Sequence, residues 1–206
     1  MSKHIIFDLD GTLINSFPVM EKAWNKVIKK FSLNISFNEY KKFTGLPFEK
    51  IMDKLELSKI SKEIKNLYFN ETKKRANQII LIKGARELLI KLKKKGYKIS
   101  IITSKPRRSF ITIKKLLPKG INLVLCSDDV NFKKPDKKLI DFYKKKFSLK
   151  TNDLTYIGDT IFDLQFSINS KINFIFFSNE KQNKLPVNII NKIKTVNKLS
   201  SLNFLV

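Results

Sequence analysis

Five short, almost continuous apolar runs constrain the fold more than any other feature of the sequence. They cover residues 5–7, 99–102, 121–125, 154–157 and 174–177. Runs of this length, rich in Ile, Val, Phe and Tyr, are typical of strands buried on both faces of a sheet. Amphipathic segments lie between them, at residues 84–95, 107–117, 137–147 and 163–170. This alternation predicts an α/β fold with a doubly wound, Rossmann-like parallel sheet.

Residues 17–80 break this alternation, because no comparable apolar run occurs there. Apolar residues recur at helical spacing instead, as in Val19, Ala23, Val27 and Phe31. A segment of this length is too long for a crossover between strands and too regularly patterned for a loop. We therefore expect an inserted α-helical cap of residues 17–80 on a core formed by residues 1–16 and 81–206.

The first apolar run leads directly into two acidic residues, Asp8 and Asp10. Residues two apart on an extended chain point to the same side, roughly 6–7 Å apart along the strand. Two carboxylates at that separation repel each other unless a cation or a shared proton lies between them. A buried strand has no structural reason to end in this way, so the pair indicates a chemical function.

Polar residues follow four of the apolar runs, at the strand ends where parallel sheets bind ligands. They include Asp8, Asp10, Gly11 and Thr12, then Thr103, Ser104 and Lys105, then Asp128, Asp129 and Lys134, and finally Asp159, Thr160 and Asp163. Carboxylates are hard ligands for Mg²⁺, and hydroxyl and ammonium groups bind phosphate. One carboxylate can attack phosphorus to give an aspartyl-phosphate, while a second protonates the leaving oxygen and then activates water. A glycine such as Gly11 lets the backbone approach the phosphate closely.

Structural interpretations compete for single members of this set. Asp159 or Thr160 could merely cap the following helix. Thr103 and Ser104 could both belong to an ordinary turn, and Lys134 alone means little in so lysine-rich a chain. A calcium-binding loop is excluded, because Val19 stands where the closing glutamate belongs. The whole set, distributed over four successive strand ends, predicts a site for Mg²⁺ and phosphate.

Four segments together resemble the haloacid dehalogenase-like hydrolase superfamily. "FDLDGTLINS" is similar to its first motif, "IITSKP" to the second, "SDDVNFKKPD" to the third and "YIGDTIFDLQFSINS" to the fourth. The position of the insertion resembles the subgroup with a helical cap. Within that subgroup, "TGLPFEKIMDKL" and "TSKPRRSFITIKKLL" look most like phosphoglycolate phosphatases.

The resemblance implies a role for each matching residue. Asp8 is the implied nucleophile, Asp10 the general acid and base, and Thr103 and Lys134 hold the phosphoryl group, with Gly11 and Ser104 as further phosphate-binding candidates. Asp8, the Asp10 carbonyl and Asp159 are the implied Mg²⁺ ligands, and Asp163 supports the metal or Lys134. The expected function is Mg²⁺-dependent hydrolysis of a small organic phosphomonoester, such as phosphoglycolate or a sugar or nucleotide phosphate.

Two other functions remain open. One is a phosphosugar mutase, although Phe48 stands where such mutases usually carry an arginine. The other is a polyanion-binding protein with a vestigial site. Phe48 and Lys105 are the main candidates for substrate specificity, and weaker candidates for contacts to the leaving group are Phe17, Trp24 and Thr44.

Composition bears on partners and location. The net charge is +24, but 38 of the 42 basic residues are lysines spread along the helices, and Asn, Ile and Phe are also frequent. This combination indicates A/T-rich codon usage more than a nucleic-acid interface, so we expect no nucleic-acid partner. No apolar run reaches the ~20 residues that span a membrane. The single cysteine, Cys126, and the absence of an apparent signal peptide predict a cytoplasmic protein. The sequence predicts no oligomeric state.

Overall fold

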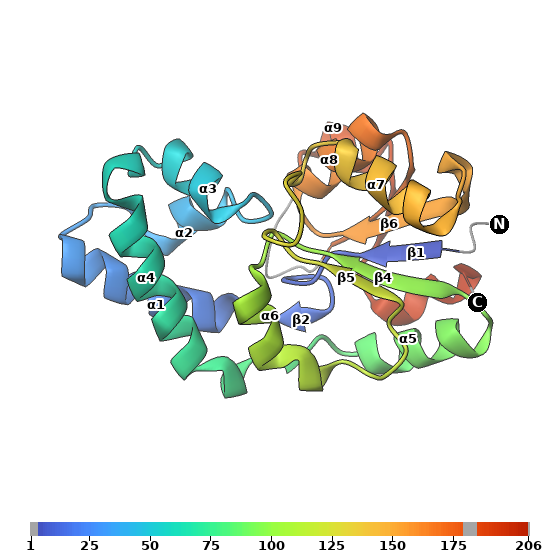
Figure 1. Ribbon diagram of the computed structural model, residues 1–206, viewed down its shortest axis with the longest axis horizontal. Helices are drawn as coiled ribbons and strands as arrows, with labels where there is room; N and C mark the ends of the chain where they lie inside the picture. The colour runs from blue at the N-terminus through green and yellow to red at the C-terminus, as the bar shows by residue number, and fades with distance from the viewer. Residues whose placement is uncertain (1–3, 179–184, 206) are drawn as a thin grey trace.

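Residues 4–178 and 185–205 are described by the computed structural model (Figure 1), so residues 1–3, 179–184 and 206 of the predicted core lie outside it. A six-stranded sheet with the order β5-β4-β1-β6-β7-β8 forms the centre, and all of its neighbouring strands are parallel. Its strands are β1 (His4–Phe7), β4 (Lys98–Ile102), β5 (Leu123–Leu125), β6 (Leu154–Gly158), β7 (Asn173–Phe177) and β8 (Lys194–Val196). This sheet confirms the predicted α/β, Rossmann-like fold.

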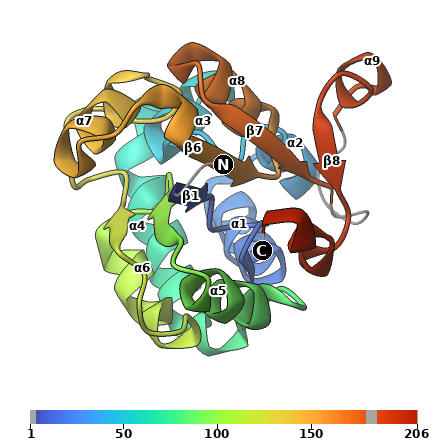
Figure 2. The same ribbon diagram turned by 90° about the vertical axis from the view of Figure 1, so that its right-hand side faces the viewer.

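The chain winds outward from β1 in both directions, first to β4 and β5, then across to β6, β7 and β8. Helices cover both faces, with α5 and α6 on one side and α7 and α8 on the other (Figure 2). Their bounds are Ala85–Lys94 for α5, Arg107–Ile113 for α6, Lys138–Phe147 for α7 and Ile161–Ser170 for α8. The change of direction at β1 produces a crevice beyond the strand ends, the usual ligand site of such sheets.

The central strand shows why the apolar runs are nearly continuous. Ile5 and Phe7 pack into the cluster under α5 and α6, whereas Ile6 packs into the cluster under α7 and α8. All three side chains are 0% exposed. Because alternate residues of a strand point to opposite faces, a strand covered on both faces needs an apolar residue at every position.

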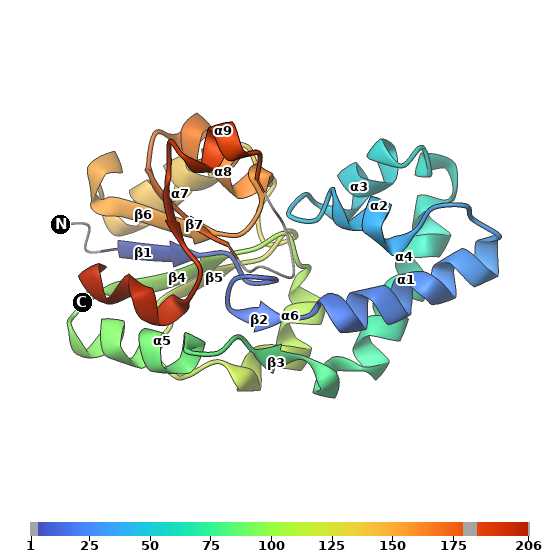
Figure 3. The same ribbon diagram turned by 180° about the vertical axis from the view of Figure 1, so that it is seen from behind.

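Helices α1–α4 stand beside the sheet with an apolar cluster of their own (Figures 1 and 3). Their bounds are Phe17–Phe31, Phe37–Lys41, Phe48–Lys54 and Ser61–Lys74. Trp24 and Tyr40 stack in this cluster, with ring centroids 4.4 Å apart. Val19 and Ile79, near the ends of the predicted cap, pack instead with the sheet cluster. The bounds 17–80 of a separate cap domain stay a prediction.

A short antiparallel ribbon that the sequence analysis did not predict connects the two parts. It pairs β2 (Ile14–Asn15) with β3 (Ile80–Leu81), so the chain leaves the sheet and returns to it at one place. The analysis also missed β8 and α9 (Val187–Ile190). Short 3₁₀ turns complete the described chain at Ser58–Ile60, Ala76–Gln78, Lys114–Leu116, Thr151–Asp153 and Leu199–Leu205.

No helix among the described residues combines the length and apolar character needed to cross a membrane.

Candidate active site

Three neighbouring strands, β4, β1 and β6, end side by side and bring Thr103, Asp8 and Asp159 to one edge of the sheet. The parallel pairing continues just past the strand ends. The amide of Asp8 donates to the Ile157 carbonyl at 2.8 Å, and that of Thr103 donates to the Leu125 carbonyl at 2.9 Å. The backbone of the sheet therefore fixes where these side chains begin.

Lys134 is the cation at the centre of the buried acids. Its Nζ donates to Asp8 Oδ1 at 2.6 Å, to Asp163 Oδ1 at 2.8 Å and to the Tyr156 hydroxyl at 3.0 Å. All three hydrogen-bond donors of the ammonium group are thus used. Burial lowers the pKa of Lys134, but the charges of Asp163 and Asp8 outweigh burial and raise that pKa well above its usual value. Lys134 is therefore charged.

Asp8 is buried and ionises with difficulty. Burial raises the pKa of its carboxyl group to about 7, and the neighbouring Asp163 adds to the increase, although the charge of Lys134 opposes both. A cation that binds beside Asp8 would therefore favour its charged form.

Asp159 has one oxygen without a partner. Its Oδ1 accepts from the Thr12 hydroxyl at 2.9 Å, whereas its buried Oδ2 has no hydrogen bond to any of the described residues. Burial, together with the charges of Asp8 and Asp163, raises the pKa of Asp159 well above its usual value. Gly11 lies directly against it with a φ of +95°, and a Cβ at that position would overlap the carboxylate. Glycine suits this position for two reasons: it adopts the positive φ easily, and without a Cβ its backbone can lie directly against the Asp159 carboxylate.

Thr160 and Asp163 form the capping box at the start of α8. The Asp163 amide donates to the Thr160 hydroxyl oxygen, and the Asp163 Oδ2 accepts from the Thr160 amide at 3.0 Å. Asp163 Oδ1 accepts from Lys134, so both oxygens of Asp163 have partners. Of the two residues suspected of being only a helix cap, Thr160 is the cap, whereas Asp159 faces the acid cluster.

Asp10 lies closer to solvent than Asp8. Its Oδ1 accepts from the Ser16 hydroxyl at 2.5 Å and from Lys105 Nζ at 2.8 Å. Lys105, predicted as a specificity residue, thus contacts the implied general acid directly.

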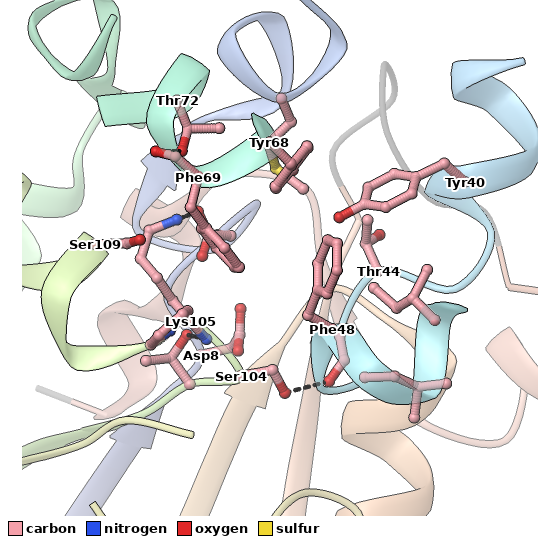
Figure 4. Close-up of a pocket in the computed structure, with 17 residues that line it drawn as sticks. Asp8, Tyr40, Thr44, Phe48, Tyr68, Phe69, Thr72, Ser104, Lys105 and Ser109 are labelled. Atoms are coloured by element: carbon pink, nitrogen blue, oxygen red, sulfur yellow. Dashed lines mark hydrogen bonds and ion pairs between the residues drawn. The ribbon is translucent and has the colours of Figure 1, made fainter. Parts of the chain in front are cut away.

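A cavity of about 80 Å³ lies over Asp8 and Asp10, between the strand ends and helices α3 and α4. Figure 4 shows Tyr40, Thr44 and Phe48 along one side, and Phe69, Thr72, Ser109 and Lys105 along the other. Thr44, Phe48 and Lys105 line it, and their contact with a leaving group stays a prediction. Phe17 and Trp24 do not line it, because both pack into the cluster of helices α1–α4.

Ser104 lines the cavity, and its role as a phosphate ligand stays a prediction. Its hydroxyl donates to the Gly45 carbonyl at 2.6 Å (Figure 4), so it joins the core to the loop before α3. A Cβ on Gly45 would come within 2.6 Å of the Thr160 hydroxyl oxygen. Gly45 is therefore in close contact with both Ser104 and Thr160.

Two buried hydroxyl groups that the sequence analysis did not assign take part in the site. Thr12 is the partner of Asp159, and its place in the first motif was the available signal. The Tyr156 hydroxyl accepts a hydrogen bond from Lys134 Nζ and donates one to the Ile102 carbonyl at 3.0 Å. Tyr156 lies within an apolar run, where an aromatic residue is normally assigned to the core.

The doubly wound sheet, its acid cluster and the cavity over the strand ends together define an α/β enzyme that acts on a small ligand. A family model described as haloacid dehalogenase-like hydrolase matches residues 5–177. The chain belongs to this family. The predicted superfamily and the class of enzyme, a hydrolase resembling phosphoglycolate phosphatases, are thereby confirmed.

Similarities to individual proteins are consistent with this family. The chain is 24% identical over 162 residues to pyrophosphatase PpaX of Oceanobacillus iheyensis, covering 78% of this chain and 76% of the relative. It is 26% identical over 186 residues to phosphoglycolate phosphatase of Haemophilus influenzae, covering 79% of each. A haloacid dehalogenase-like protein from Bacteroides fragilis has the same fold, with a TM-score of 0.86, 20% identity and coverage of 98% of this chain and 100% of that one.

Proposed function

We propose that this protein is a Mg²⁺-dependent phosphatase that hydrolyses a small organic phosphomonoester through an aspartyl-phosphate on Asp8. One observation carries the proposal. Asp8 lies 2.6 Å from the Lys134 ammonium and beside Asp159, which has a buried unpaired oxygen, directly below a cavity that opens toward the helical part. This arrangement brings together a nucleophile, a cation and a metal ligand.

The acid cluster fits a magnesium ion. One carboxylate oxygen each from Asp8, Asp159 and Asp163 lies within 4.8 Å of the others. A buried carboxylate oxygen without a partner is unfavourable unless a positive charge meets it. Asp8, Asp159 and the Asp10 carbonyl would hold the ion, whereas Asp163, whose oxygens already have partners, supports Lys134. When bound, Mg²⁺ supplies positive charge that offsets the repulsion between the nucleophile and the phosphoryl group.

In the first step an Asp8 oxygen attacks phosphorus and the bond to the leaving oxygen breaks. Asp10, in its protonated form, gives its proton to that oxygen. In the second step the Asp10 carboxylate takes a proton from water, and the resulting hydroxide attacks phosphorus. The bond to Asp8 then breaks and phosphate is released. Thr103 and Lys134 hold the phosphoryl oxygens during both steps.

The size of the cavity, about 80 Å³, supports a small leaving group. The names of the relatives, which specify pyrophosphate and phosphoglycolate, support the same range of substrates. We propose 2-phosphoglycolate, or a sugar or nucleotide phosphate, as the substrate class. The chain has a single cysteine, Cys126, and therefore no pair for an internal disulfide, which supports the cytoplasm as the proposed location.

The first test is hydrolysis of p-nitrophenyl phosphate with and without Mg²⁺. The wild-type protein should turn it over only with the metal, and Asp8→Asn should lower kcat at least a thousandfold. Asp141→Asn, which removes the same charge from the exposed surface of α7, serves as the matched control and should retain wild-type kcat. Wild-type kcat in Asp8→Asn would contradict the assigned nucleophile.

The mutase is weakened by one feature of the cavity: Phe48, and not an arginine, forms that part of its wall. Product analysis with a hexose 1-phosphate distinguishes the two enzymes, because a phosphatase releases phosphate and a mutase returns an isomer. A salt titration of RNA binding tests the polyanion alternative. Loss of binding above about 50 mM salt would support the absence of a nucleic-acid partner.

A further inference from the structure

Arg108 differs from the other arginines of the chain in its contacts. The sequence contains four arginines among 42 basic residues. Three of them donate hydrogen bonds to oxygen atoms: Arg75 to Glu71, Arg86 to the Leu116 carbonyl, and Arg107 to Asp129 and the Val124 carbonyl. Arg108 instead stacks on the ring of Phe69, with Cζ 4.9 Å from the centroid. Within residues 4–178 and 185–205, its guanidinium has no hydrogen bond or ion pair.

Phe69 is a wall residue of the active-site cavity, so Arg108 stands next to that cavity. Arg108 also lines a neighbouring pocket between α4 and α6, which we call the α4–α6 pocket. This pocket and the active-site cavity share four wall residues, Phe69, Thr72, Lys105 and Ser109. Figure 4 shows these four along one side of the cavity, with Asp8 at its base. Arg108 therefore lines a pocket that adjoins the active-site cavity along these shared residues.

The lining of the α4–α6 pocket has positive charge and no acid. Its charged residues are Lys73, Lys105 and Arg108, accompanied by hydroxyl groups of Thr72, Ser109 and Thr112. Arg108 also borders a second pocket, but there Glu49 forms ion pairs with Lys65 and Lys133. Among the described residues the lining of the α4–α6 pocket holds no acid, and of its basic groups Lys105 pairs with Asp10 in the neighbouring cavity.

We infer that Arg108, with Lys105 and Lys73, binds a second anionic group on the leaving group of the substrate. The inference rests on the proposed phosphatase activity and narrows its substrates to phosphomonoesters that also carry a carboxylate or a second phosphoryl group. Arginine suits this role because its planar fork can bind either group through two parallel hydrogen bonds. Stacking holds that plane against Phe69, which is itself a wall residue of the active-site cavity.

Lys105 links the two spaces. Its Nζ lies 2.8 Å from Asp10 Oδ1, and its side chain lines both the active-site cavity and the α4–α6 pocket. A leaving group whose ester oxygen is near Asp10 therefore extends along Lys105 toward Arg108. A neutral leaving group would gain no charge–charge attraction from Lys105 and Arg108.

Matched substrate pairs test the inference. The first pair is 2-phosphoglycolate and 2-hydroxyethyl phosphate, in which a hydroxymethyl group replaces the carboxylate. The second is fructose 1,6-bisphosphate and fructose 1-phosphate. The wild-type protein should have the higher kcat/KM for the anionic member of at least one pair. The preference is the kcat/KM of the more anionic substrate divided by that of its partner. Arg108→Gln should lower this ratio about tenfold to a hundredfold, mainly through KM, as expected for a lost charged hydrogen bond. Arg108→Lys should recover part of it.

Lys115→Gln is the control for net charge. Lys115 is exposed just beyond α6 and lines neither pocket, so this variant should keep the wild-type ratio within twofold. The pair that responds identifies the carboxylate or the phosphoryl group as the anion. An unchanged ratio in Arg108→Gln, or a wild-type protein with no preference in either pair, overturns the inference. If p-nitrophenyl phosphate is still hydrolysed with Mg²⁺ in that case, the proposed phosphatase activity stands.

Discussion

Without metal, the folded protein should lose stability through Asp8 as the pH rises from 5 to 8. Burial raises the pKa of Asp8 from 3.8 to about 7 in the folded state. Between those two values the folded state keeps a proton that the unfolded chain has lost, so the free energy of unfolding falls as the pH rises. The two pKa values correspond to a total loss of about 4 kcal/mol in the free energy of unfolding as the pH rises. About 3 kcal/mol of this loss occurs above pH 5.

Asp8→Asn removes this ionisation and keeps the shape of the side chain. Lys134 keeps its bonds to Asp163 and Tyr156, and its attraction for Asp8 is already included in the pKa of about 7. At pH 8 the metal-free variant should therefore be about 3–4 kcal/mol more stable than the wild type. For a chain of this length that is about 6–16 °C in Tm. At pH 5 the advantage should shrink to about 1–2 kcal/mol, because wild-type Asp8 is then protonated in the folded state.

Thermal and urea unfolding at pH 5, 6, 7 and 8 in a chelator would measure this effect. Burial lowers the pKa of His4, which makes the protein more stable as the pH rises, but this contribution is common to both proteins and cancels in their difference. Mg²⁺ should raise the Tm of the wild type more than that of Asp8→Asn. Greater stability of the wild type at pH 8 in the chelator would refute the reasoning.

Three further variants test other parts of the site. Lys134→Met removes the cation of the acid cluster and should destabilise the metal-free protein by about 3–5 kcal/mol at pH 8, as measured by urea unfolding. Gly11→Ala should abolish Mg²⁺-dependent turnover and cost about 1–3 kcal/mol of stability, because φ is +95° and the added Cβ overlaps Asp159; activity assays and melting curves check both effects. Ser104→Ala should cost about 1 kcal/mol and speed hydrogen exchange near Gly45, whose carbonyl it releases. A loss of phosphate affinity in that variant without faster exchange would favour a phosphate-binding Ser104.

The sheet and the position of the site could be predicted because they follow from local patterns and one topological rule. The apolar runs identify strands, and parallel strands present their carboxyl ends at one edge. This rule brings Asp8 and Lys134 together across 126 positions of sequence, where the structure has them 2.6 Å apart. It also brings in Asp159, whose helix-capping alternative the sequence alone left open.

Other contacts depend on side-chain direction, which the same patterns do not specify. Tyr156 has the periodicity of a core residue, and only the structure shows that its hydroxyl reaches Lys134. Ser104 and Thr103 are adjacent hydroxyl residues after one strand, yet Ser104 turns to the Gly45 carbonyl. The β2–β3 ribbon has two residues in each strand, too few for any periodicity to be visible.

The acid cluster links stability and ligand binding through the same charges. Asp8 follows β1, whose four residues are all buried and which pairs on both sides, so the packing of the sheet holds the acids together despite their repulsion. A cation that binds only the folded state relieves that repulsion and stabilises the fold by mass action. Replacing Asp8 or Asp159 by Asn should therefore stabilise the metal-free protein and weaken its response to Mg²⁺, whereas Asp163, whose oxygens bind Lys134 and the Thr160 amide, should not behave in this way. Opposite changes of this kind in one variant distinguish a binding site from a packing defect, because a packing defect lowers stability with and without the metal.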